Sequence, residues 1–422
     1  MVILGKTPGF KSKLFRWIQF QVDLEKLMQK TSAMILAGGR GKRMGILCDS
    51  RPKPALPFAG DHSVIDFTLS NCLNSGITNI GVLTGYQGPC IRRYIKSWQA
   101  LNAPDTNITA LEPRTGLYAG TADAVYRNLS YLSHHDANTA LILAADHIYK
   151  MDYREIIDFH HRVKADVTVG VIQIPMEKAS HFGTVFTDTQ SRILNFVEKP
   201  ARPRSNLVSL GIYVFNTLPL SQYLIEDSHL PDSIHDFGHI ILPKMVKQAR
   251  VFAYQFKGYW QDIGTPEAYH RANLHFAESN STVFSDQPWP IYSNQIKHQD
   301  DKIQNGSRWK DSIIGPGCVI KGKLENSVLS PGVWVGENAV VRNSVIMSNV
   351  TIGRNTIVNS AVLDEGVATG EYCQIGNIDK TELTLLGQNT KIPSHHSIGA
   401  EGIITRKGHL ISSGLQLESA LV

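Results

Sequence analysis

Apolar residues in the first half of the chain gather in short continuous runs separated by helical patterns. Such runs are typical of strands buried on both faces, as in a parallel sheet covered by helices. Residues 63–77 and 120–132, between them, carry apolar positions at helical spacing. From residue 183 to 256 the pattern becomes hairpin-like, which predicts a mixed extension of the same sheet. We therefore expect an α/β domain of the doubly wound, Rossmann-like kind. The apolar runs occupy residues 33–38, 79–85, 140–149 and 166–174.

Polar residues between these segments place candidate chemistry at one edge of the sheet. Gly76 ends the first predicted helix, and we expect the side chain of Thr121 to cap the second. The pair Gly38-Gly39 and the carboxylate Asp146 each follow a predicted strand. Ligands of such sheets bind beyond the carboxyl ends of the strands, so these residues are predicted to share one crevice.

The C-terminal part of the chain repeats every 17 residues. Residues 326–342, 343–359 and 360–376 align without a gap, and each block divides into six, six and five residues. Three short strands per turn, each placing one aliphatic side chain in a narrow interior, predict a left-handed parallel β-helix. A partial earlier coil is expected at residues 312–320. The recurring aliphatic residues are Leu329, Val335, Val341, Ile346, Ile352, Val358 and Leu363.

These patterns divide the chain into four parts. We expect a catalytic domain over residues 31–280, a linker over 281–305, and the β-helix with a C-terminal tail over 306–422. Residues 1–30 are interpreted as a poorly ordered extension, with Met28 as a possible true start. The alternative for this extension is a short amphipathic helix that contacts a membrane or a partner.

Composition narrows the class of protein. The net charge of +5 arises from 42 basic and 37 acidic residues without a basic block, which favours a small phosphorylated ligand over nucleic acid. Five cysteines without close spacing indicate neither a disulfide framework nor a structural zinc, and they favour a reducing cytoplasm. No apolar run approaches the roughly 18 residues of a membrane span.

The stretch around Gly38–Gly41 is a candidate phosphate loop. A Walker motif is excluded because Leu36 stands where its first glycine belongs, and a dinucleotide fingerprint is excluded because Met44 replaces its third glycine. A glycine-rich turn remains, whose backbone N–H groups approach phosphates while Arg43 and Lys53 supply positive charge.

The stretch resembles the signature of the sugar-phosphate nucleotidyltransferases, most closely the branch that makes ADP-glucose for glycogen and starch. The resemblance runs in order through "ILAGGRGKRM", "RPKPALPFAG", "GTADAV", "ADHIYKMDY", "FVEKP", "GIYVF", "HDFG" and "YWQDIGT", and ends in the β-helix. It implies transfer of a nucleotidyl group from ATP to glucose 1-phosphate with Mg²⁺. It also implies a homotetramer, or an assembly of this chain with a regulatory paralogue.

The resemblance also implies a role for each candidate residue. Asp146 and Asp262 share the metal, while Arg43 and Lys53 grip the triphosphate. Lys199 holds the sugar phosphate, and Glu198 holds the sugar hydroxyls. Asp123 shapes the floor of the nucleotide site. The other residues implied to bind substrate are Gly38, Gly39, Tyr118, Gly120, Gly183, Ser209 and Gly211. Ser209 and Gly183 are equally interpretable as packing residues, and His235 is interpreted as structural.

Several positions depart from the usual pattern of this family. Ser50, Gly85, Leu117 and Ala119 stand where members carry residues linked to effector response, so the usual activation by glycolytic intermediates is not assumed. The loop "ITALEPRTG" lacks the glutamine that members place against adenine, so no base-reading residue is assigned. Three alternatives stay open: a UTP- or dTTP-dependent relative, a non-catalytic regulatory subunit and, least favoured, a β-helix acyltransferase.

Overall fold

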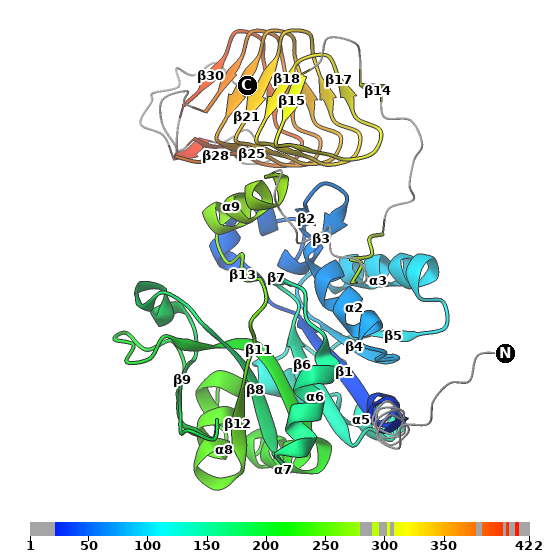
Figure 1. Cartoon of the computed structure of the whole chain (residues 1–422). Coiled ribbons are helices and arrows are strands. Elements are labelled where there is room, and N and C mark those ends of the chain that lie inside the picture. Colours follow the sequence, from blue (N-terminus) through cyan, green and yellow to red (C-terminus); the bar gives the residue numbers. More distant parts are fainter. Residues whose placement is uncertain are drawn as a thin grey trace, which may run out of the picture.

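The computed structural model describes residues 22–278, 289–294, 302–303, 308–376, 382–399, 402–404 and 410–412 of the 422-residue chain. An α/β unit and a β-helix lie one above the other, with helix α9 (Pro266–Ala277) between them (Figure 1). The expectation for residues 1–21 lies outside the described residues. Residues 22–29 form a helix whose Leu24, Leu27 and Met28 pack on the core of the sheet.

A nine-stranded mixed sheet forms the centre of the α/β unit, as the sequence predicted. Seven of its strands follow the order β10-β9-β11-β6-β1-β4-β5, and β8 and β12 extend it from β11. The pairs β1–β4, β1–β6, β4–β5 and β8–β12 are parallel, whereas β11 runs antiparallel to β6 and β8. The strands are β1 (Thr31–Ala37), β4 (Asn79–Thr84), β5 (Asn107–Leu111), β6 (Thr139–Ala144), β8 (Val167–Gln173), β9 (Thr184–Thr187), β10 (Ile193–Val197), β11 (Leu207–Asn216) and β12 (Val251–Gln255).

Helices cover both faces of this sheet because its strands are apolar on both sides. In β1, Ala33 and Ile35 point into the core shared with α2, α3 and α6, whereas Met34 points into the core shared with α4, α5, α7 and α8. Alternate residues of a strand face opposite sides, so a continuous apolar run buries both. The helices are α2 (Val64–Asn74), α3 (Gly88–Asn102), α4 (Thr121–Tyr126), α5 (Leu129–His134), α6 (Tyr153–Arg162), α7 (Thr217–Ser228) and α8 (Leu242–Gln248).

Two local predictions were wrong in detail. The predicted helix 120–132 is broken into α4 and α5, and Gly120 rather than Thr121 occupies its N-cap. The hydroxyl of Thr121 instead donates to Asp236 Oδ2 at 3.0 Å, so a long-range partner replaces the local cap. The predicted strand 140–149 stops at Ala144 and resumes as β7 (His147–Tyr149), which pairs with β13 (Trp260–Asp262) outside the main sheet. That break turns Asp146 out of the sheet.

The C-terminal repeat forms a left-handed β-helix whose coils pair in parallel in three sheets, as predicted, and Leu410–Ser412 adds an antiparallel strand to the third sheet. Val328 pairs with Val345, and Val345 pairs with Val362, so successive coils are 17 residues apart. Val362 then pairs with Leu385, 23 positions later, so the next coil is six residues longer than the repeat. The seven recurring aliphatic residues of the sequence pattern are all buried.

The three sheets of the β-helix are built from very short strands. The first holds β14 (Lys302–Ile303), β17 (Val319–Ile320), β20 (Trp334–Val335), β23 (Thr351–Ile352), β26 (Ala368–Thr369) and β29 (Lys391–Ile392). The second holds β15 (Arg308–Lys310), β18 (Lys323–Glu325), β21 (Val340–Arg342), β24 (Ile357–Asn359), β27 (Gln374–Ile375) and β30 (Ser397–Ile398). The third holds β16 (Ile313–Ile314), β19 (Val328–Leu329), β22 (Val345–Ile346), β25 (Ala361–Leu363), β28 (Thr384–Leu386), β31 (Ile403–Ile404) and β32 (Leu410–Ser412).

The third sheet of the β-helix packs on the α/β unit through an apolar cluster. Phe58, Tyr269 and Phe276 of the α/β unit lie in one buried cluster with Val345 and Leu385 of the β-helix. His270 of α9 adds a polar contact, its Nε2 lying 2.7 Å from the carbonyl oxygen of Asn343. Burial of these aromatic side chains away from water stabilises the contact between the α/β unit and the β-helix.

Residues 289–294, inside the predicted linker, lie along α2 and α3. The indole N–H of Trp289 donates to Asn71 Oδ1 at 2.9 Å, and the backbone N–H of Tyr292 donates to Ser70 Oγ at 2.9 Å. The ring of Tyr292 meets Trp98 edge to face at 6.3 Å. This part of the linker is therefore fixed to the α/β unit. None of the helices in the described segments is both long enough and apolar enough to cross a bilayer.

Candidate active site

The glycine turn after β1 forms the floor of a cavity of about 520 Å³. The carbonyl oxygen of Gly38 accepts a hydrogen bond from the backbone N–H of Tyr86 at 3.1 Å, so the turn lies against the end of β4. A Cβ atom at Gly85 would come within 2.8 Å of that carbonyl oxygen. A side chain at residue 85 would therefore force the glycine turn to move. The cavity is lined by Gly38, Gly39, Lys53, Tyr118, Gly120 and Asp146, among others.

Lys53 lies between two carboxylates at the open end of this cavity. Its Nζ is 3.0 Å from Asp146 Oδ2 and 3.3 Å from Asp262 Oδ1, and its side chain is only 6% exposed. Burial alone would lower the pKa of Lys53, but Asp146 and Asp262 raise it above its ordinary value. Burial likewise opposes ionisation of Asp146, yet Lys53 and His147 hold the pKa of this carboxyl well below its usual range. Lys53 and Asp146 are therefore both charged at neutral pH.

Asp146 and Asp262 meet because β7 pairs with β13. In that antiparallel pair, His147 is directly opposite Asp262, and Asp146 precedes His147 in the chain. Ligand atoms of all three residues lie within 4.8 Å of one another. Two hard carboxylate oxygens suit a divalent cation such as Mg²⁺, and a ring nitrogen of His147 lies within reach of the same position. The sequence analysis assigned the two carboxylates but missed His147, whose only signal was its position next to Asp146.

Arg43 lies beside Asp262 rather than in the lining of the cavity. A Cβ atom at Gly264 would come within 2.9 Å of both Arg43 Nη2 and Asp262 Oδ2, which places guanidinium and carboxylate over the same glycine. The residue is exposed at the start of the 3-10 segment Lys42–Cys48. Arg43 is therefore an exposed cation beside Asp262, whereas Lys53 is a buried one.

Glu198 is held in a second group of residues, formed with Gly183, Gly238 and Lys199. A Cβ atom would come within 2.7 Å of Glu198 Oε2 at Gly183 and within 2.4 Å of it at Gly238, so only glycines leave room for this carboxylate. Lys199 pairs with it, with Nζ 3.2 Å from Glu198 Oε1, and the lysine side chain is 55% exposed. An exposed ammonium group next to a fixed carboxylate suits a sugar phosphate.

Ser209 and Gly211 on β11 connect this second group to the metal-ligand candidates. The backbone N–H of Gly211 donates to Ser209 Oγ at 3.3 Å, and Ser209 N donates to the carbonyl oxygen of Gly183 at 2.8 Å. Gly211 has a φ of +68°, which favours glycine, and a Cβ atom there would lie 3.4 Å from His147 Cε1. The hydrogen bond from Ser209 to Gly183 is a packing role, and it also shapes the wall near Glu198.

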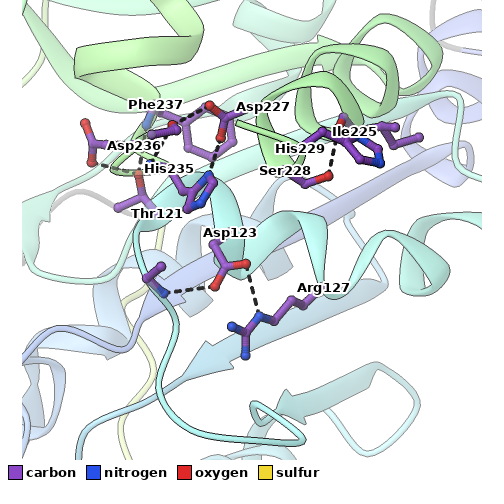
Figure 2. A network of polar contacts seen from close by, with 12 residues as sticks. Thr121, Asp123, Arg127, Ile225, Asp227, Ser228, His229, His235, Asp236 and Phe237 are labelled. Atoms are coloured by element: carbon purple, nitrogen blue, oxygen red, sulfur yellow. Dashed lines mark hydrogen bonds and ion pairs between the residues drawn. The ribbon is translucent and has the colours of Figure 1, made fainter. Parts of the chain in front are cut away.

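Asp123 is not part of the cavity lining, and its carboxylate instead joins the start of α4 to Arg127 and to the preceding loop (Figure 2). Its carboxylate accepts from the backbone N–H of Ala119 at 2.9 Å and from Arg127 Nε at 3.0 Å. Arg127 in turn donates to the carbonyl oxygen of Thr115 at 2.9 Å. Tyr118 lines the cavity while its hydroxyl donates to the carbonyl oxygen of Leu111 at 3.2 Å. Asp123 thus shapes the site indirectly.

The "HDFG" motif, residues 235–238, lines the cavity through Asp236 and lies against the N-terminus of α4. The carbonyl oxygen of His235 accepts from the backbone N–H of Ala122 at 2.8 Å, which satisfies the N-terminus of α4. The ring of His235 contacts buried Asp227, with Nδ1 2.8 Å from Oδ2 (Figure 2). His235 is therefore structural, as expected. Asp236 lines the cavity and was missed as a site residue, although its motif was recognised.

The fold and this site together define a nucleotidyltransferase domain joined to a hexapeptide β-helix. Residues 32–279 match the family model described as nucleotidyl transferase, and residues 295–385 match the GlmU-like C-terminal hexapeptide model. The first match spans more than half of the chain. The chain therefore belongs to the nucleotidyl transferase family.

Curated relatives share one function. A glucose-1-phosphate adenylyltransferase of Thermosipho africanus is 43% identical over 397 residues, which cover 89% of this chain and 96% of that protein. That of Geobacillus stearothermophilus is 43% identical over 326 residues, covering 75% of this chain and 84% of that protein. That of Pseudothermotoga lettingae is 44% identical over 323 residues, covering 74% and 77%.

Proposed function

We propose that this chain catalyses the reaction of ATP with α-D-glucose 1-phosphate to give ADP-glucose and diphosphate, a step toward glycogen or another α-glucan. The single observation that carries the proposal is the position of Lys53, buried between Asp146 and Asp262 beside the glycine turn. A fixed cation between two carboxylates suits a site where two polyanions must be brought together. Similarity to three adenylyltransferases supports ATP and glucose 1-phosphate as substrates.

In this proposal an oxygen of the sugar phosphate attacks the α-phosphorus of ATP while diphosphate leaves. Gly38 and Gly39 let the triphosphate approach the backbone, and Lys53 with Arg43 neutralises it. Asp146 and Asp262 would hold Mg²⁺, which when bound neutralises charge on the reacting phosphates. The chain supplies mainly positioning and charge, because the reaction needs little proton transfer.

Glu198 and Lys199 take the other substrate in this proposal. The fixed Glu198 carboxylate accepts hydrogen bonds from sugar hydroxyls, and Lys199 binds the phosphate of glucose 1-phosphate. Ser209, Gly183 and Gly211 shape the sugar pocket. The Nε2 atom of His147 lies 3.6 Å from Asp146 Oδ1, and its ring packs on that of Trp260 with 5.0 Å between the ring centroids.

The proposal extends to assembly and location. We infer a homotetramer, as the family resemblance implies. We also infer that the enzyme is cytoplasmic, because its proposed substrate ATP is available in that compartment. The division proposed from the sequence is residues 1–30, 31–280, 281–305 and 306–422. We amend it at two places, because residues 22–29 pack on the core of the sheet and Lys302–Ile303 pairs within the β-helix.

The test is release of diphosphate by purified protein with glucose 1-phosphate and Mg²⁺, using ATP, UTP, dTTP and GTP in turn. We expect activity with ATP, and we expect Asp146→Asn to abolish it while surface variant Asp188→Asn does not. Preference for UTP or dTTP would show that the chain is a UTP- or dTTP-dependent relative instead. The assay has to decide this, because no side chain has been assigned to recognition of the base. Release from none of the four would favour a regulatory subunit. Adding sugar-phosphate effectors to the same assay tests regulation.

A further inference from the structure

Arg51, two residues before Lys53, reaches out of the α/β unit into the β-helix. Its guanidinium forms an ion pair with Asp364, which follows β25 at a corner of the coil. The side chains are only 8% and 1% exposed. Arg51 Nη1 also contacts Met347 Sδ at 3.8 Å and Glu365 Oε2 at 3.9 Å. The two paired residues are 313 positions apart in the chain, so only the tertiary structure brings them together.

The corner that carries Asp364 is fixed by the β-helix ladder. The backbone N–H of Asp364 donates to the carbonyl oxygen of Leu386 at 2.9 Å, and its own carbonyl oxygen accepts from Val367 at 3.2 Å. Its Oδ1 also accepts from the backbone N–H of Glu365 at 2.6 Å. Parallel coils on both sides leave this corner little freedom. Asp364 therefore offers Arg51 a rigid point of attachment.

The chain between Arg51 and Lys53 transmits this attachment to the active site. Pro52 lies between them with a φ of −74°, and Lys53 begins the 3-10 segment Lys53–Ala55. The backbone N–H of Ala55 donates to the carbonyl oxygen of Pro52 at 2.9 Å, and Pro54 stiffens the turn further. A shift at Arg51 is therefore passed on to the backbone of Lys53.

The pair is poorly explained as a source of stability. Burial raises the pKa of Asp364 even though Arg51 lowers it, so taking this carboxylate out of water is unfavourable. Buried ion pairs often stabilise a fold no more than apolar residues of the same size do, and their best-attested use is to fix register. The surrounding cluster of Phe58, Tyr269 and Leu385 already joins the two parts through apolar contact.

We propose that Asp364 is a positioning residue for the transfer reaction: by holding Arg51, the β-helix sets the position of Lys53 between Asp146 and Asp262. This inference rests on the proposed function. Displacing a catalytic group by about 1 Å can reduce a rate about 100-fold, so loss of this anchor affects turnover. The sugar-binding group around Glu198 is carried by other elements and is not moved.

The test compares Asp364→Asn, which removes the charge at constant shape, with the control Glu365→Gln next to it. We expect kcat/KM for ATP to fall about 10- to 100-fold in Asp364→Asn, while KM for glucose 1-phosphate changes less than about 3-fold. Glu365→Gln is expected to match the wild type. Wild-type-like kcat/KM for ATP in Asp364→Asn, or a rise in KM for glucose 1-phosphate as large as the loss in kcat/KM for ATP, overturns the inference.

A double variant separates positioning from folding. Arg51→Met with Asp364→Leu removes both charges, and we expect its thermal midpoint to stay within a few degrees of wild type while kcat/KM for ATP remains low. Full activity of this stable double variant overturns the inference. If Asp364→Asn does not fold, Asp364→Glu is used, which keeps the charge and is expected to recover part of the activity.

Failure of the proposed function is recognised separately, since the wild type is assayed in parallel. If the wild type releases no diphosphate, equilibrium binding of ATP by wild type and Asp364→Asn replaces turnover. Weaker binding by the variant supports the inference, and equal binding overturns it.

Discussion

The close contact between Gly120 and the backbone of Ile234 and His235 leads to the first prediction. Gly120 has an extended backbone that any residue can adopt, so a substitution there is limited by space alone. A Cβ atom would come within 2.3 Å of the carbonyl oxygen of His235 and 2.4 Å of that of Ile234. Both are backbone atoms, so rotation of a side chain cannot relieve the clash.

In Gly120→Ala the segment at residues 234–236 has to retreat by about 1 Å to restore ordinary contact distances. The retreat weakens the hydrogen bond from Ala122 to His235 and displaces Asp236 at the cavity wall. We expect a loss of about 1–3 kcal/mol in the free energy of unfolding from overpacking. We also expect kcat/KM to fall by about 10- to 100-fold, because the cavity wall moves by about 1 Å.

Diphosphate release measures kcat and KM, and denaturant unfolding measures stability. Ala119→Ser is a matched control, because it adds one atom at the neighbouring exposed residue and leaves the backbone hydrogen bond to Asp123 intact. If Gly120→Ala unfolds like the wild type and keeps kcat/KM within about 2-fold, the close packing over Gly120 does not control the site and the reasoning fails.

Three further predictions concern charge. Lys53→Met leaves Asp146 and its partner carboxylate unneutralised and should lower kcat at least 100-fold, as judged by diphosphate release; equal loss in the exposed Lys310→Met would contradict this. Chelation by EDTA should abolish turnover and Mg²⁺ should restore it, and activity that survives dialysis against EDTA would remove the metal from the proposal. Burial lowers the pKa of His160 to about 4, so its folded form is neutral and stability is lost as the pH falls from about 6.5 toward 4. Urea unfolding should show a loss of about 2 kcal/mol between pH 7.5 and 5 that His160→Gln removes, and identical pH slopes for both proteins would refute it.

Local patterns predicted the architecture because each element depends on its own residues. Continuous apolar runs gave the buried strands, and the 17-residue repeat gave the coils of the β-helix down to the residues that fill it. The same reasoning failed at Thr121. Its hydroxyl suits a local cap, but the structure offers it Asp236, 115 residues away.

The candidate site was partly predictable for a similar reason. The glycine turn and Lys53 lie in one stretch, so the type and order of residues already indicated phosphate binding. His147 was missed because a histidine next to an aspartate has no chemical meaning until β13 pairs with β7 and brings Asp262 opposite it. Asp236 was missed because its carboxylate reaches the cavity only through the fold of the segment that covers α4.

By itself, then, the sequence determined the order of elements, the repeat of the β-helix and the phosphate loop, since these depend on neighbours within about 20 residues. Only the tertiary structure decided which distant groups share an environment. Lys53 is the clearest case. Its charge and its two proline neighbours can be read directly from the sequence. Its two carboxylate partners, Asp146 and Asp262, are 93 and 209 positions away. The anchor beside it comes from a β-helix corner 313 residues after Arg51. Folding brings such groups together, and burial strengthens their electrostatic interaction. No local sequence pattern determines which groups meet.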